Sequence, residues 1–454
     1  MKNKFILLIL SLIFLFSGYA HTAAAAVTDE EGYFHEEVLP NGLKVFAIKD
    51  PNAPLSVFQI WYDAGSINEQ IGKTGLSHLL EHMMFKGTPM YGPKTFSRMI
   101  KRAGGIDNAG TSKDFVFYYQ KLAPDRLDLS IELEADRMRN LIMDRKETLS
   151  ERDVVMEERR MRLEDDPQSL VYEEVVAAAF KNHPYRWPVI GWMTDLETIT
   201  RDDLMDYYRT RYVPNNAMIV VAGDIDISLI MAKIKKAFGD ISRGPEIEKL
   251  NVREPEQRGE KRVYVKKEAE LPYVLSAYKA PNLLQDDSYA LEVLASVLSD
   301  GKSTRIYRSL IDKQQIALSA GASYSGIHNK YPYLFYVYGT ALPGKKIEDV
   351  EAALYEEVDK IKKTPPAERE VQKAKNQIEA DFIMNQDSIF YRAMIVAQFE
   401  LIGDWKLKDK YLEGIEKVTP GDVQRVAKKY LIEDQRTVGI LVPIQNSKLK
   451  TQDQ

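Results

Sequence analysis

Two histidines and a glutamate lie close together in the stretch SHLLEHMMFKGT, which runs from Ser77 to Thr88. On an α-helix, positions i, i+3 and i+4 share one face, so His78, Glu81 and His82 are predicted to point the same way. Two imidazoles one turn apart can bind one Zn²⁺, and a carboxylate beside the ion can take a proton from water whose pKa the ion lowers to about 7. A core helix with ordinary buried histidines is the alternative, and the motif alone does not decide between them.

A candidate for a third ligand lies in the charged segment LSERDVVMEERRMRLEDDP, which has a helical pattern and contains Glu151, Glu157 and Glu158. Glu151 and Glu158 are seven positions apart, or two helical turns, so they are predicted to share a face. Taken alone, a segment with so many charges is better explained as a solvated surface helix.

The two segments together, HLLEH followed by ERDVVMEE, resemble the inverted zincins, the peptidase family of pitrilysin, insulysin and the mitochondrial processing peptidase. The histidine-first order H-x-x-E-H is a metallopeptidase signature. The family's third zinc ligand is a glutamate, and Glu158 stands at the matching position, 76 residues after His82. Its neighbour Glu157 is the rival for that role. The family's supporting glutamate, one heptad earlier, corresponds to Glu151.

The resemblance implies a zinc metalloendopeptidase. Zn²⁺ would be held by His78, His82 and Glu158, and Glu81 would act as the general base on the attacking water. A non-catalytic structural subunit, or a peptide-binding subunit of a processing-peptidase-like complex, is the alternative function.

The segment DNAGTSKDFVFYY resembles the family's N-A-x-T segment, an edge strand that pairs with the substrate backbone. This resemblance implies that Asn108, Ala109 and Gly110 bind substrate by β-augmentation. Judged from its residues alone, the longer stretch 103–123 looks like a loop that feeds a strand. The substrate would be an extended peptide or an unfolded polypeptide.

Runs typical of strands alternate with runs typical of helices, which predicts an α+β or α/β class. Strands are predicted within 41–50, 55–66 and 216–226, and helices within 74–88, 124–143 and 150–167. A polar stretch rich in Pro, Gly and charge, 241–262, is interpreted as a linker between an N-terminal zinc-binding domain, 27–240, and a C-terminal domain, 263–454. The resemblance implies an α+β fold of two homologous α/β-sandwich domains, each a mainly antiparallel sheet packed with helices.

The two halves of the chain also resemble each other in outline, which indicates a duplication. Aligning Gly87 with Gly301 places Glu292 opposite His78 and Ser296 opposite His82. The second half is therefore expected to be an inactive repeat that keeps the scaffold and lacks the metal-binding residues.

One departure from the family concerns the groups that steady the substrate oxyanion. Full-length members carry an arginine and a tyrosine in a C-terminal repeat, whereas this chain has Ile311 and Leu318 at the matching positions of SLIDKQQIALSA. An apolar side chain cannot donate a hydrogen bond to an oxyanion. We therefore expect a homologous partner subunit that supplies the Arg/Tyr pair in a heterodimer, with a homodimer as the alternative.

Composition narrows the function classes further. The net charge of −5 argues against a nucleic-acid-binding protein, which usually carries a basic face. The chain has no cysteine, so it forms no disulfide and depends on packing for its stability.

The first 26 residues have the layout of a cleavable signal peptide. Lys2 and Lys4 precede an apolar run, 5–16, and small residues up to Ala26 follow. A membrane anchor is the alternative, but the apolar stretch is near the lower limit for a spanning helix. The mature protein is expected to be periplasmic or secreted, with no stable membrane span after cleavage.

Overall fold

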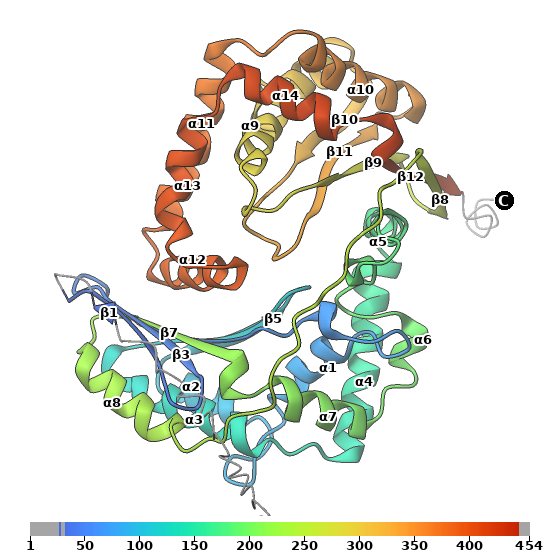
Figure 1. The fold of residues 1–454 in the computed structure, drawn as a ribbon. Coiled ribbons are helices and arrows are strands. Elements are labelled where there is room, and N and C mark those ends of the chain that lie inside the picture. Colours follow the sequence, from blue (N-terminus) through green and yellow to red (C-terminus); the bar gives the residue numbers. More distant parts are fainter. Residues whose placement is uncertain (1–26, 29–31, 445–454) are drawn as a thin grey trace, which may run out of the picture.

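Two β-sheets with flanking helices form the body of this computed structural model, which describes residues 27–28 and 32–444 (Figure 1). The predicted signal peptide, 1–26, lies outside the described residues. The first sheet has the strand order β1-β2-β3-β7-β4-β6-β5 and the second β10-β11-β9-β12-β8. The strands of the first sheet are β1 Val27–Thr28, β2 Phe34–Val38, β3 Lys44–Lys49, β4 Ser56–Tyr62, β5 Ile106–Thr111, β6 Val116–Leu122 and β7 Ala217–Gly223. Those of the second are β8 Lys261–Glu268, β9 Tyr273–Ala280, β10 Ala317–Ser323, β11 Tyr333–Ala341 and β12 Arg436–Ile444.

Helices cover both sheets, so the class is α+β, as predicted. Those of the first half are α1 Leu76–Met83, α2 Thr95–Arg102, α3 Leu127–Asn140, α4 Arg145–Arg159, α5 Pro167–Ala179, α6 Met193–Leu196, α7 Arg201–Arg211 and α8 Ile227–Phe238. Those of the second half are α9 Asp287–Ser299, α10 Ile347–Lys363, α11 Glu368–Asn385, α12 Ile389–Ile402, α13 Leu407–Glu416 and α14 Pro420–Tyr430. Within the described ranges, no helix is both long and apolar enough to cross a membrane.

The two sheets repeat one topology, as the duplication predicts. The series β3-β7-β4-β6-β5 corresponds to β8-β12-β9-β11-β10. In each series the first two strands are parallel and the other neighbours are antiparallel. Helix α1 follows the central strand β4, and α9 follows its counterpart β9. The alignment that sets Glu292 opposite His78 is therefore consistent with the fold, because both residues lie on these equivalent helices.

The stretch 103–123, expected to be a loop feeding a strand, contains two strands. β5 and β6 form an antiparallel hairpin whose turn is closed by a hydrogen bond from Ser112 N–H to Phe115 C=O, 2.8 Å. The short polar β5 carries no alternating pattern of its own, and the ladder with β6 satisfies its backbone groups. β5 lies at the edge of the sheet, where the family resemblance places a substrate-binding strand.

One helix from each half of the chain packs against the sheet of the other half. Helix α5 packs against β8, β9 and β12 of the second sheet, whereas α12 packs against β4 and β7 of the first. Trp61 and Val220 of the first sheet form one apolar cluster with Ala393 and Val396 of α12. β8 begins at Lys261, inside the stretch predicted as linker, because pairing with β12 starts there.

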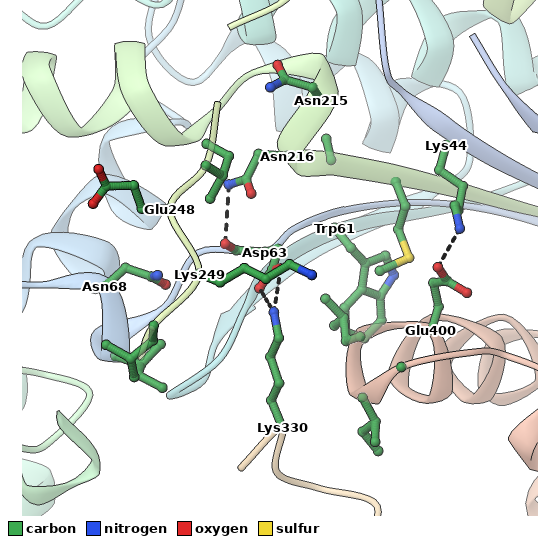
Figure 2. A pocket seen from close by; sticks show the side chains of 18 of the residues that line it. Lys44, Trp61, Asp63, Asn68, Asn215, Asn216, Glu248, Lys249, Lys330 and Glu400 are labelled. Carbon is green, nitrogen blue, oxygen red and sulfur yellow. Dashed lines mark hydrogen bonds and ion pairs between the residues drawn. The ribbon is translucent and has the colours of Figure 1, made fainter. Parts of the chain in front are cut away.

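Charged contacts also join the two halves (Figure 2). Nζ of Lys330 lies 2.7 Å from Oδ1 of Asp63, and Nζ of Lys44 lies 2.5 Å from Oε1 of Glu400 on α12. Asn216 donates from Nδ2 to the backbone carbonyl of Asp63, 3.2 Å. These bonds surround a cavity of about 510 Å³ between the halves.

Candidate metal centre

Helix α1 is fixed at its first turn by Glu69, a residue that sequence reasoning missed. The buried Glu69 carboxylate accepts hydrogen bonds from the N–H groups of Gly75, 2.8 Å, and Ser77, 2.7 Å. Gly75 has φ of 95°, and a Cβ there would lie 2.6 Å from the carbonyl oxygen of Ile190. Backbone N–H groups at the start of α1 thus have a hydrogen-bond acceptor. The close backbone contact and the positive φ at Gly75 require glycine there. Only the folded chain brings these residues together.

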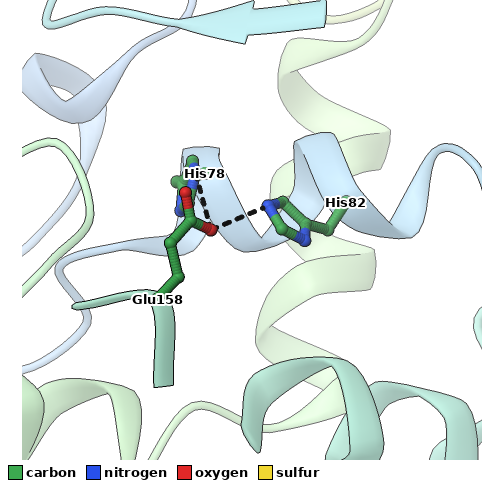
Figure 3. Close-up of side chains that lie close together, drawn as sticks. All are labelled: His78, His82 and Glu158. Carbon is green, nitrogen blue, oxygen red and sulfur yellow. Dashed lines mark ion pairs between the residues drawn. The ribbon is translucent and has the colours of Figure 1, made fainter. Parts of the chain in front are cut away.

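His78 and His82 project from one face of α1 toward Glu158 of α4 (Figure 3). Nε2 of His78 lies 3.8 Å from Oε2 of Glu158, and Nε2 of His82 lies 3.4 Å from the same oxygen. The three potential ligand atoms all lie within 4.8 Å of one another. The spacing of four residues on a helix explains why the two histidines lie on one face of α1. The packing of α4 against α1 places the Glu158 carboxylate next to them.

This donor set fits a zinc ion. Zinc binds histidine nitrogen and carboxylate oxygen at about 2.0–2.2 Å in a tetrahedral arrangement, which separates neighbouring ligand atoms by roughly 3.3 Å. The observed separations of 3.4 and 3.8 Å are close to that value. Burial, with the positive charges of His82 and Arg162, lowers the pKa of His78 to about 3, so the imidazole is neutral, as a metal ligand must be.

Glu151 contacts the His82 nitrogen that does not face Glu158. Its Oε1 lies 2.8 Å from Nδ1 of His82, and its other oxygen contacts Lys86. The hydrogen bond from His82, followed by the contact with Lys86, lowers the pKa of Glu151 to about 2. An ionised carboxylate can only accept, so Nδ1 carries a proton and Nε2 is the nitrogen directed at Glu158. Such carboxylate–histidine pairs orient metal ligands in proteins.

The rival glutamates on α4 have different surroundings. The Glu157 side chain is 60% exposed and pairs with Arg160, whereas that of Glu158 is 17% exposed and faces the histidines. Oε1 of Glu158 forms an ion pair with Nη1 of Arg162, 2.9 Å, which leaves Oε2 for the histidine side. The next residue, Arg159, is buried and fixes this end of the helix by two hydrogen bonds of 2.8 Å to Glu173 on α5.

Glu81 lies on the same face of α1 and accepts a hydrogen bond from the Thr111 hydroxyl of β5. Burial raises the pKa of Glu81, although the bond from Thr111 opposes the rise. A carboxylate with a raised pKa is better suited to accept a proton and then release it near neutral pH. Thr111 was missed as a site residue, although it occupies the fourth position of the N-A-x-T segment.

A cavity of about 680 Å³ joins these groups to the edge strand. Asn108, Ala109 and Gly110 all line it beside the two histidines and Glu81. A Cβ at Gly110 would lie 2.8 Å from the Phe117 ring on β6, which explains the glycine there. All the lining residues belong to the first half of the chain.

Comparison with known proteins shows the family. A family model described as Insulinase (Peptidase family M16) matches residues 44–191, and one described as Peptidase M16 inactive domain matches residues 198–378. Zinc protease PqqE of Helicobacter pylori is 33% identical over 414 residues, which cover 90% of this chain and 93% of that protein. The chain belongs to peptidase family M16.

Solved structures share the fold of this M16 chain. The crystal structure of a protease from Helicobacter pylori matches with a TM-score of 0.87 and 31% identity, covering 90% of this chain and 99% of that one. The periplasmic protease PqqL from Escherichia coli matches with a TM-score of 0.75 and 17% identity, covering 92% of this chain and 48% of that one. The predicted family and two-domain fold are thereby confirmed, and the curated relative from Helicobacter pylori is named a zinc protease.

The second half of this M16 chain contributes none of the described residues that line the metal-side cavity. Leu318 is 57% exposed on the edge strand β10, and Ile311 packs against the core of the second half. The nearby Arg305 forms two hydrogen bonds of 2.8 Å with Glu370. The geometry therefore gives no sign that Arg305 replaces the family's arginine at the metal centre.

Proposed function

We propose that this chain is the metal-bearing subunit of a zinc metalloendopeptidase that hydrolyses extended peptides. The observation that carries the proposal is the convergence of His78, His82 and Glu158 in a cavity that also contains Glu81 and the edge strand β5. Zinc ligands, a base and an edge strand that can pair with a peptide together suit zinc-dependent hydrolysis of an extended peptide.

In this mechanism His78, His82 and Glu158 hold the ion. Zn²⁺, when bound, supplies Lewis acidity that polarises the scissile carbonyl and lowers the pKa of the attacking water. Glu81 removes a proton from that water and delivers it to the leaving amine. Thr111 holds the Glu81 carboxylate in place through its hydroxyl. β5 aligns the substrate by backbone hydrogen bonds, with Asn108, Ala109 and Gly110 along the peptide.

A second, homologous chain completes this proposed enzyme. Among the described residues, the first half alone lines the cavity, and apolar Ile311 and Leu318 occupy the positions of the family's Arg/Tyr pair. A partner that brings its own Arg and Tyr over the metal would form the heterodimer, with a homodimer as the alternative. The absence of the Arg/Tyr pair favours a second candidate function, that of a non-catalytic subunit. The complete set of metal-binding residues, His78, His82 and Glu158, argues against it.

Export is part of the proposal. Residues 1–26 have a basic start, an apolar run and small residues, and the fold is shared with a periplasmic protease of Escherichia coli. Cleavage near Ala26 would leave a periplasmic or secreted protein. N-terminal sequencing of the protein from the exported fraction tests this, and a retained Met1 in a cytosolic protein would refute it.

Metal analysis with a peptidase assay tests the proposed function. The purified chain should contain about one zinc, and the double variant His78→Ala/His82→Ala should contain almost none. His35→Ala, on β2 of the same sheet, is the matched control and should keep its zinc. Glu81→Gln should keep zinc and lose about 10²–10⁴-fold in turnover, measured with the partner present. Full zinc in the double variant, or full turnover in Glu81→Gln, would overturn the proposal.

A further inference from the structure

A second cavity adjoins the metal centre beside α1. It has a volume of about 730 Å³, and Glu81, His82 and Asn108 line it as well as the first cavity. The two hollows therefore meet at the face of α1 that carries the proposed base. A peptide paired with β5 would pass from one into the other, because Asn108 of that strand belongs to both.

The wall of this second cavity is strongly basic. Lys94, Arg98, Lys101 and Arg102 all line it from α2 and the residue before that helix. Within α2, Lys101 and Arg102 lie three and four positions after Arg98 and share its side of the helix, and Lys94 precedes the helix. Like charges at such spacing destabilise a helix, so this face gains from an anionic neighbour.

The described residues supply no such neighbour. All four side chains belong to exposed residues, and no carboxylate of the described chain forms an ion pair with any of them. Asp107 of β5 accepts from Ser97 of α2, 2.5 Å, and does not line the cavity. Some other surface cations are paired, as Arg425 and Lys429 are with Asp287. In a chain of net charge −5, this is a local concentration of unpaired positive charge.

The two carboxylates that line the cavity do not neutralise its basic wall. Glu151 contacts His82 and Lys86, and Glu81 accepts from Thr111. The basic face extends over the nine residues from Lys94 to Arg102, and the eight steps between them span about 12 Å along a helix. That length matches three to four residues of an extended peptide at about 3.3 Å each.

We infer that this groove, named here the α2 groove, selects substrates with acidic residues on one side of the scissile bond. The inference rests on the proposed function and adds the substrate class. Aspartate and glutamate side chains of a peptide on β5 would face Lys94, Arg98, Lys101 and Arg102. A concave groove beside a strand edge suits a peptide better than a flat anionic membrane, which is the other anionic surface to test.

Binding measurements in the Glu81→Gln background test the α2 groove without requiring turnover. Three labelled peptides share an apolar centre and carry four aspartates, four asparagines or four lysines on one side, and a second set carries them on the other side. The acidic peptide of one set should bind about tenfold or more tighter than its neutral counterpart at low ionic strength. The preference should vanish near 1 M salt, where the Debye length is about 3 Å.

Charge reversal identifies the residues responsible. Arg98→Glu/Lys101→Glu should abolish or invert the preference, and the milder Arg98→Gln/Lys101→Gln should reduce it. Lys345→Glu/Lys346→Glu makes the same change in net charge at exposed positions before α10, outside the α2 groove, and should bind like the parent. Equal binding of all three peptides in both sets, or an unchanged preference after reversal, would overturn the inference.

The outcomes separate the two proposals. Cleavage of acidic, neutral and basic peptides alike would overturn the α2 groove and leave the peptidase standing. Acid-selective binding with no cleavage by the parent chain and partner would support the groove and overturn the peptidase. Reversal-sensitive binding to phosphatidylglycerol vesicles, without discrimination among peptides, would overturn the inference in favour of a membrane surface.

Discussion

Oε1 of Glu151 lies 2.8 Å from Nδ1 of His82, so a carboxylate on α4 fixes the orientation of an imidazole on α1. The same carboxylate contacts Lys86, and this pairing keeps it ionised. Nε2 of His82 is thereby directed at Glu158 before any metal arrives. Under the proposed function, Glu151 would be a positioning residue, and its removal should weaken metal binding without removing a ligand.

Glu151→Ala is accordingly expected to weaken zinc affinity by about 10–100-fold, the usual cost of losing a carboxylate behind a ligating histidine. Competition with a chromophoric chelator measures the affinity directly. Glu147→Ala is the control, because Glu147 approaches Lys86 at 3.9 Å and forms no bond to His82. Equal affinities for the two variants would show that Glu151 has no part in holding the metal.

Glu158→Gln and Glu157→Gln separate the rival ligands. Glu158 faces the histidines, whereas Glu157 is exposed and paired with Arg160, so only Glu158→Gln should lose zinc. The neutral amide is a much poorer zinc ligand than a carboxylate. Zinc content after gel filtration gives the answer, and zinc loss in Glu157→Gln alone would reverse the assignment.

Thr111→Val removes one hydroxyl at nearly constant volume. Glu81 then loses its hydrogen-bond donor on β5, so its carboxylate is less well oriented toward the water. Turnover in the presence of the partner should fall by about tenfold, the cost of one hydrogen bond to a charged group, while zinc content stays constant. Thr210→Val, at an exposed position of α7 where the hydroxyl donates to backbone carbonyls of its own helix, is a control that leaves Glu81 untouched. Turnover equal to that of the parent would remove Thr111 from the mechanism.

The partner prediction concerns the missing oxyanion groups. Loss of one such donor typically costs about 10²–10³-fold in turnover, so the chain alone should be weakly active or inert. Mixing it with a homologue that carries the Arg/Tyr pair should restore activity. The measurement is peptidase turnover at increasing ratios of the two chains. Full activity of this chain as a monomer or homodimer would show that another group steadies the oxyanion.

Glu254, which lies outside the metal centre, is expected to make the stability of the fold depend on pH. It accepts from the N–H groups of Lys181, Asn182 and His183 and from Nζ of Lys279. Although burial opposes the shift, the bond from Lys279 and those backbone bonds lower the pKa of Glu254 to about 2. Because the folded pKa is below the ordinary value of 4.5, this stabilisation is present above pH 4.5 and is lost as the pH falls toward 2.

Glu254→Gln should therefore lower the free energy of unfolding by about 1–3 kcal/mol at pH 7, and the difference from the parent should shrink below pH 4.5. Urea unfolding at several pH values measures it. Glu256→Gln is the control, since the Glu256 side chain is 69% exposed. A constant difference between pH 7 and pH 3 would contradict the assigned pKa.

The sequence by itself determined whatever depends on local geometry. The positions of His78, Glu81 and His82 follow from helical periodicity, because 100° per residue puts i, i+3 and i+4 on one face. The apolar runs predicted the central strands β3, β4 and β7, whose backbones need pairing wherever they lie. The resemblance supplied the family and the two-domain fold, which the comparisons confirm.

Only the tertiary structure decided which distant groups meet these helices and strands. Glu157 and Glu158 differ by one helical step, and the docking of α4 through Arg159 selects which of them faces α1. Thr111 and Glu69 reach α1 from other elements, so no local period reveals them. Likewise the cations of α2 line a cavity only because β5 and α1 lie beside them. Periodicity fixes the direction of a side chain on its own element, but its partners depend on long-range packing, which a single sequence does not encode in any local pattern.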